Sequence, residues 1–145
     1  MKQLILPDNN IFSELTKKQP EINVVQTFER CAKDRNKQLI LAITVWHELL
    51  YGLHNIKAEE IKKKERISAF LFNNVLSLPM YHYTQECADI HAKIRAECRA
   101  KGKTLSFADS QIASIALANN AILVTRNVDD FKYIDGLMIE NWFDN

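Results

Sequence analysis

Glycine and proline are both scarce in this sequence, with three of each among its 145 residues. Turn-rich all-β folds use many more of these two residues, so their scarcity favours helices with short connections. Long apolar runs are missing too, since none approaches the ~20 residues that a membrane-spanning helix needs. The apolar patch near the N-terminus is too short for the core of a signal peptide. We therefore expect a cytoplasmic protein that does not enter a membrane.

Cysteine is rare and charge is nearly balanced, which argues against two further classes of protein. The three cysteines are an odd number without C-x-x-C spacing, which does not fit a disulfide framework and fits a reducing compartment. The net charge of +1 creates no overall field that would attract nucleic acid. Basic residues nevertheless gather in two groups, each of which is either a solvated helix face or a contact for nucleic acid. The groups are Lys57, Lys62, Lys63, Lys64 and Arg66, and Arg95, Arg99, Lys101 and Lys103.

Short apolar segments alternate with segments of helical periodicity. Apolar residues make up 47% of the chain and charged residues 26%, which is typical of a globular protein, and the length fits one domain over 1–145. The expected strands span 3–6, 38–43, 121–125 and 137–141, with an extended piece at 76–81. The expected helices span 10–15, 21–35, 45–53, 57–74, 84–101 and 106–120, with Thr44 as a possible cap of the third. This alternation predicts an α/β fold with a mostly parallel sheet covered on both faces.

Acidic residues recur where the predicted strands end. Asp8 follows the first strand, Glu48 lies early in the helix after the second, and Asp109 lies in the first turn of the helix before AILVT. Further polar residues follow AILVT itself, namely Thr125, Asn127, Asp129 and Asp130. Because ligands of such sheets bind at the carboxyl ends of the strands, we expect these groups to share one edge.

Each acid also has a purely structural explanation. Asp8 can cap a helix, Ser106 and Asp109 resemble a capping box, and Glu48 suits a helix start. Capping alone, however, does not require acids that share one sheet edge or lie within apolar sequence. Clustered carboxylates in apolar surroundings raise one another's pKa and therefore need cations. Oxygen ligands select Mg²⁺ or Mn²⁺, which can ionise water and neutralise charge on a phosphodiester.

Four segments occur in a fixed order: PDNNIFSEL, ITVWHELLYGL, LSFADSQIASIAL and AILVTRNVDDF, with DGLMIENW after them. The ordered set resembles the motifs of the PIN domain, in particular the VapC-type ribonuclease toxins of bacterial toxin–antitoxin pairs. The resemblance implies a three-layer α/β/α domain that cleaves cellular RNA, such as transfer or ribosomal RNA, with Mg²⁺ or Mn²⁺. It also implies a homodimer and a small cognate antitoxin protein.

The resemblance carries over to individual residues. Asp8, Glu48 and Asp109 match the first three acidic positions, so Asp8 and Asp109 are expected to hold the metal. Glu48 is expected to hold a second ion or to orient water. The fourth acidic position falls at Asn127, an amide, and Asp130 is the neighbouring carboxylate that could replace it. Two residues are expected to support the site: Asn10 and Thr125.

Three other motifs are weaker. His47 and Glu48 begin an H-E-x-x-H pattern, but position 51 is tyrosine, so the second zinc ligand is missing. Gly102-Lys103-Thr104 lacks the earlier glycine and the preceding strand of a P-loop. One face of the helix expected over 84–101 presents Cys87, His91, Ile94 and Cys98. This pattern favours a core or interface stripe over a zinc site.

Two rival functions remain. One is a PIN-like module that has lost catalysis and binds RNA or a protein, which the amide at Asn127 favours. The other is a phosphoacceptor receiver domain, which needs a lysine after a late strand. The strand at 121–125 ends in Thr125-Arg126 instead, which argues against the receiver.

Overall fold

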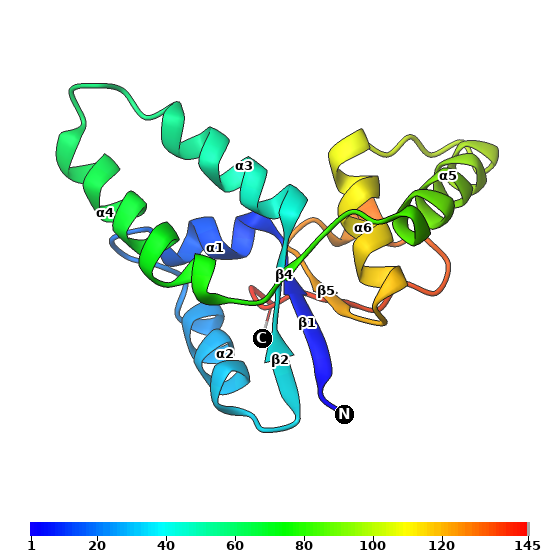
Figure 1. Cartoon of the computed structure of the whole chain (residues 1–145), viewed down its shortest axis with the longest axis horizontal. Helices are drawn as coiled ribbons and strands as arrows, with labels where there is room; N and C mark the ends of the chain where they lie inside the picture. Colours follow the sequence, from blue (N-terminus) through cyan, green and yellow to red (C-terminus); the bar gives the residue numbers. More distant parts are fainter. Residues whose placement is uncertain (145) are drawn as a thin grey trace.

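The structure is a computed structural model that describes residues 1–144, so Asn145, the last residue of the predicted domain, lies outside the described part. Helices and strands alternate along the chain, and Figure 1 labels most of them. Their order is β1 (Gln3–Pro7), α1 (Asn9–Leu15), α2 (Ile22–Lys33), β2 (Lys37–Leu39), β3 (Leu41–Ala42), α3 (Ile43–His54), α4 (Ile61–Asn73), the 3₁₀ turn η1 (Val75–Ser77), β4 (Met80–Tyr81), α5 (Gln85–Ala100), α6 (Phe107–Ala118), β5 (Ile122–Val124), α7 (Val128–Phe131) and β6 (Ile139–Glu140). Among residues 1–144, no helix has both the length and the apolar character to cross a membrane.

The central sheet is parallel throughout. Four strands lie in the order β2-β1-β5-β6, and β3 and β4 form a separate parallel pair. Figure 1 shows α1 to α4 on the left of the view and α5 and α6 on the right. The buried apolar residues of α2 belong to one apolar cluster, and those of α3, α4, α5 and α6 belong to another. The predicted α/β architecture, with helices on both faces of a parallel sheet, is confirmed.

The sheet separates two apolar clusters. Ile5 and Leu6 are neighbours in β1 and are both buried, yet Leu6 belongs to the larger cluster and Ile5 to the smaller. Leu123 and Val124 of β5 divide in the same way. Successive side chains of a strand point to opposite faces, so this division requires a sheet that is buried on both faces. The predicted strands are continuous apolar runs because both faces of the sheet are buried.

The predicted strand over 38–43 is wrong as a single element. The Ile40 N–H donates to the Ile5 carbonyl at 2.9 Å, whereas the Leu41 N–H donates to the Pro79 carbonyl at 2.9 Å. The chain therefore changes its pairing partner between β2 and β3. An apolar run gives no signal for such a change, because both halves are equally buried.

Helix boundaries also differ from the predicted ones. Helix α3 begins at Ile43, so Thr44 is not its cap, and the Thr44 hydroxyl instead donates to Gln111 Oε1 at 2.7 Å. The same helix continues through Gly52, where an added Cβ would meet nothing within 4 Å. Helix α4 begins at Ile61 rather than at residue 57. The short helix α7 was not predicted at all.

The predicted cap at Ser106 is confirmed, and the predicted helix start at Thr84 is also a cap. The Thr84 hydroxyl accepts the Cys87 N–H at 3.3 Å at the start of α5. The Ser106 hydroxyl accepts the Asp109 N–H at 3.0 Å at the start of α6. The second cap matters for the site, because it fixes the turn that contains Asp109.

Candidate functional site

Asp8 lies at the carboxyl end of β1, where the strand passes into α1. Its side chain is only 2% exposed, and its Oδ1 accepts the N–H of Asn9 at 2.8 Å. Its Oδ2 accepts the hydroxyl of Thr125 at 2.9 Å. Burial raises the pKa of Asp8, these two hydrogen bonds oppose the rise, and the charge of Asp109 adds to it. Asp8 therefore caps a helix, as the structural explanation held, and it also interacts with a second acid.

Thr125 and Asn10 form the frame around Asp8. Asn10 Nδ2 donates to Asp8 Oδ2 and to Thr125 Oγ1, both at 3.3 Å. Thr125 Oγ1 also accepts the N–H of Asn127 at 3.1 Å, and Asn10 Oδ1 accepts the N–H of Arg126 at 3.2 Å. These bonds join the ends of β1 and β5, so both predicted supporting residues contact the first acid.

Glu48 lies in α3, whose start follows β3. Burial, then the charge of Asp8, then that of Asp109, raises the pKa of Glu48 to about 7. Burial also raises the pKa of Asp109, the charge of Asp130 adds to this rise, and the Ser106 side chain opposes it. Carboxylates affect one another in this way only across short distances, so α3, α6 and the end of β1 bring their acids to one place.

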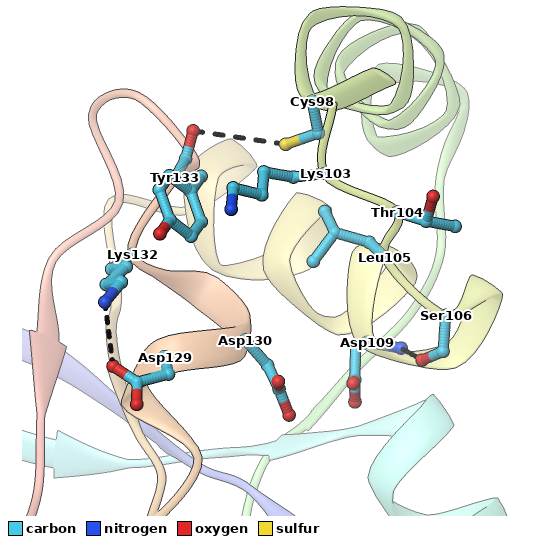
Figure 2. A pocket seen from close by; sticks show the side chains of 10 residues that line it. All are labelled: Cys98, Lys103, Thr104, Leu105, Ser106, Asp109, Asp129, Asp130, Lys132 and Tyr133. Carbon is cyan, nitrogen blue, oxygen red and sulfur yellow. Dashed lines mark hydrogen bonds and ion pairs between the residues drawn. The ribbon is translucent and has the colours of Figure 1, made fainter. Parts of the chain in front are cut away.

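Asp130, rather than Asn127, faces Asp109. Asp109, Asp129 and Asp130 line one cavity of about 540 Å³, and Figure 2 shows Asp109 and Asp130 side by side and pointing the same way. Asp129 instead forms an ion pair with Lys132 at 3.0 Å. The side chain of Asn127 is exposed, and only its backbone N–H takes part in the frame. The structure therefore gathers Asp8, Glu48, Asp109 and Asp130.

The donor set of this edge suits a hard divalent cation. Its groups are carboxylates and neutral oxygens, and the carboxylates hinder one another's ionisation, so a cation would relieve the strain. Within residues 1–144, no three His, Cys, Asp or Glu side chains already form a cage for a metal ion. Mg²⁺ does not require such a cage, because it commonly binds one or two carboxylates together with waters and substrate phosphates. The residues present therefore fit this ion.

A buried histidine connects α5 to the helix that contains Asp109. His91 is 3% exposed, and its Nε2 lies 2.7 Å from Ser110 Oγ. The Ser110 hydroxyl donates to the Ser106 carbonyl at 2.9 Å, so it accepts from Nε2–H, and Nδ1 accepts the Tyr83 hydroxyl at 2.8 Å. Sequence reasoning placed His91 in a core stripe with Cys87, Ile94 and Cys98, and all four are buried. It missed Ser110, since no local pattern pairs residues in different helices.

Comparison with known proteins agrees with this fold. The sequence model described as PIN domain matches residues 5–137. Ribonuclease VapC2 of Rickettsia felis is 32% identical over 135 residues, covering 93% of this chain and 95% of that protein. The tRNA(fMet)-specific endonuclease VapC of Shigella flexneri is 31% identical over 114 residues, covering 79% and 82%. This chain therefore belongs to the PIN-domain family, as a relative of the VapC ribonucleases.

A solved structure agrees with the sequence comparison. The crystal structure of VapBC2 from Rickettsia felis, bound to a DNA fragment from their promoter, contains a chain that is 30% identical to this one. The two superpose with a TM-score of 0.81, over 97% of this chain and 99% of the other. The predicted family is confirmed.

Proposed function

We propose that this protein is an endoribonuclease that depends on Mg²⁺ or Mn²⁺. The observation that carries the proposal is that Asp8, Glu48 and Asp109 come from three separate segments and meet at one partly buried edge, where burial and their neighbouring charges raise the pKa values of Asp8 and Glu48. A fold gains no stability by holding like charges together, so the arrangement calls for a cation. Asp8 and Asp109 would hold it, and we assign the fourth acidic position to Asp130 rather than to Asn127.

Each residue of the site then has its own role in the reaction. A bound divalent ion supplies a Lewis acid that activates water and neutralises charge on the phosphodiester. Thr125 and Asn10 hold the Asp8 carboxylate in one orientation through the bonds described above. Glu48 would orient the water whose oxygen bonds to phosphorus as the bond to O3′ breaks, so that the products are a 5′-phosphate and a 3′-hydroxyl that takes up a proton. Asp130 supports Asp109 from the neighbouring segment.

Transfer RNA is the substrate to test first, because a relative carries that specificity in its name. The wild-type chain should cleave initiator tRNA in Mg²⁺ or Mn²⁺, and Asp8→Asn should lower the rate at least 100-fold, as expected for loss of a metal ligand. Asp89→Asn is the matched control, since Asp89 is exposed on α5 away from the described acids. Asp8→Asn protein that cleaves at the wild-type rate contradicts the proposal. Electrophoresis of end-labelled RNA measures each rate.

We further propose a cytoplasmic homodimer that a small antitoxin neutralises. Large apolar residues are exposed on the α3–α4 hairpin and support a protein partner there. They are Tyr51, Ile61 and Phe72. Light scattering should give twice the mass of one chain for the purified protein. Addition of the antitoxin should raise that mass and stop cleavage. The mass of a single chain would refute the homodimer, and cleavage that persists with the antitoxin would refute neutralisation.

The amide at Asn127 favours a second candidate, a PIN-like module that binds RNA without cleaving it. The two candidates differ in their response to Mn²⁺. A functional site gains about 2.7 kcal/mol of stability when the ion is at 100 times its dissociation constant. Thermal unfolding with and without Mn²⁺ should show this gain in the wild type and not in Asp109→Asn. An unchanged melting temperature in the wild type would support the non-catalytic module.

A further inference from the structure

The two basic groups of the chain lie at opposite ends of the molecule. One group is on and near α4 and the other is on α5, and Figure 1 shows these helices at the two extremes of the long axis. The α4 group shares its cavity with acids, since Lys62 and Lys63 line it together with Glu59 and Glu60. The α5 group has different surroundings, so the two need not bind the same ligand.

A basic groove runs along α5. A cavity of about 720 Å³ is lined by Arg95, Arg99 and Lys103, together with the small residues Ala96 and Ala100. No acid lines it, and within residues 1–144 none of its three cations forms an ion pair. The cations recur every four residues, which places the two arginines about 6 Å apart along the helix axis. That separation is of the order of the distance between successive phosphates in an extended strand.

The basic groove is continuous with the acidic site. Lys103, Thr104 and Leu105 line both the groove and the cavity that contains Asp109. Figure 2 shows this stretch of chain between α5 and Asp109, with the Lys103 side chain directed toward Tyr133. The Lys103 ammonium lies 4.6 Å from the centre of the Tyr133 ring. A strand held along α5 would therefore lead to the acids.

An exposed aromatic ring lies beside Arg95 of the groove. Phe107 is the first residue of α6, two positions before Asp109, and it is 58% exposed. The Arg95 guanidinium lies 5.4 Å from the centre of its ring. His91 packs edge-on against the same ring, with centres 4.9 Å apart, so the ring is held in place. Exposed aromatic rings beside cations are the common stacking platforms for single-stranded nucleic acids.

We propose that the α5 groove binds single-stranded RNA, with phosphates on Arg95, Arg99 and Lys103 and a base stacked on Phe107. The inference rests on the proposed function for its choice of ligand and deepens it, because it gives the path of the strand to the acids. Single strands suit this surface, since an unpaired base is free to stack whereas a duplex hides its base faces.

Binding of an RNA oligonucleotide at several salt concentrations tests the proposal. The probe is a fluorescein-labelled, unstructured RNA, measured by anisotropy in an Asp8→Asn background so that it is not cleaved. Arg95→Gln with Arg99→Gln should lower the slope of log affinity against log salt by about 1.4, since each phosphate contact on a single strand contributes about 0.7. The matched control, Lys62→Gln with Lys63→Gln, removes the same charge and should leave the slope unchanged. A slope that stays at the wild-type value in the Arg95→Gln, Arg99→Gln protein, or that falls equally in the control, overturns the proposal.

Phe107 has a separate signature. Phe107→Ala should weaken binding about tenfold without changing the salt slope, because the ring is uncharged and stacking on one base is lost. Phe107→Trp should keep the wild-type affinity. Equal affinity of the alanine and wild-type proteins would overturn the stacking role. If the α5 variant binds RNA more weakly but the wild-type chain does not cleave RNA, the proposed enzyme is refuted and the groove is not. If the wild-type chain cleaves RNA but the α5 variant binds it as well as the wild type does, the groove is refuted and the enzyme is not.

Discussion

Asp8 and Glu48 are both acids with raised pKa values, but they are held differently. Both oxygens of Asp8 accept hydrogen bonds, from the Asn9 N–H and the Thr125 hydroxyl. Within residues 1–144 no group donates a hydrogen bond to the Glu48 carboxylate, which faces the charges of Asp8 and Asp109 instead. In the absence of a cation, the charge of Glu48 therefore lowers the free energy of unfolding more than that of Asp8 does.

The stability of the metal-free protein should depend on pH through Glu48. Its pKa is about 7 in the folded protein and 4.5 as the ordinary value, so the folded state binds the proton more tightly. The free energy of unfolding contributed by this group therefore falls as the pH rises from about 4.5 to about 7. Glu48→Gln removes the titration, so the variant should be more stable than the wild type by an amount that grows over this range and then levels off.

The comparison of the two proteins is necessary because His91 titrates with the opposite sign. Burial, and then the charge of Arg95, lowers the pKa of His91 below 6.5, which makes its contribution fall as the pH drops through the same range. Urea unfolding in EDTA at several pH values measures the difference between wild type and Glu48→Gln. A constant difference across pH 4.5–7.5 would mean that Glu48 is not the strained acid.

At the scale of elements, α5 holds the first turn of α6 through buried polar groups. The chain of bonds runs from Tyr83 through His91 to Ser110, and from there to the Ser106 carbonyl. Ser106 also caps the helix by accepting the Asp109 N–H. The orientation of one acid thus depends on a helix that contributes no acid to the site.

His91→Leu should destabilise the protein by about 1–3 kcal/mol, because the half-buried Tyr83 hydroxyl loses its acceptor and the buried Ser110 oxygen loses the N–H that it accepts. His91→Gln is the matched control, since its amide can donate to Ser110 and accept from Tyr83. In a double-mutant cycle, His91→Leu and Ser110→Ala should be coupled by about 0.5–3 kcal/mol. Chemical denaturation measures all four proteins, and strictly additive effects would contradict the bond between the two residues.

Elements with local signals were predictable from the sequence, and those fixed by distant contacts were not. The caps at Thr84 and Ser106 and the strand before Thr125 follow from neighbouring residues. The break at Ile40 depends on Ile5 and Pro79, which lie far away in the chain. For the site, the family resemblance supplied Asp8, Glu48 and Asp109. The choice between Asn127 and Asp130 required the unpredicted helix α7, which turns Asp130 toward the cavity.

At the scale of the whole molecule, the end of the chain completes the smaller apolar cluster. Trp142 is buried there with Ile5 and Val24, and its ring meets Phe28 edge-on at 6.3 Å. Phe28 in turn meets Phe12 at 6.2 Å. The C-terminal segment therefore packs against the first strand and the first two helices, which makes unfolding of these regions cooperative.

Trp142→Ala should destabilise the whole protein by about 3–5 kcal/mol, because it empties a large buried site. The loss should appear as one cooperative transition at a lower urea concentration, rather than as separate release of the C-terminal segment. Tyr51→Ala is the control, since Tyr51 is 65% exposed and its removal should change stability by less than about 0.5 kcal/mol. Equal unfolding curves for the tryptophan variant and the wild type would contradict this packing.

The bond between the Thr125 hydroxyl and Asp8 joins residues that are 117 positions apart. During translation, Asp8 leaves the ribosome long before Asp109, Thr125 and Asp130 are made. A nascent chain, or a fragment cut short by a premature stop codon, thus has the first acid without Thr125, Asp109 and Asp130. Such products cannot form the bond between Thr125 and Asp8, so this edge of the sheet takes its final form only after Thr125 has been synthesised.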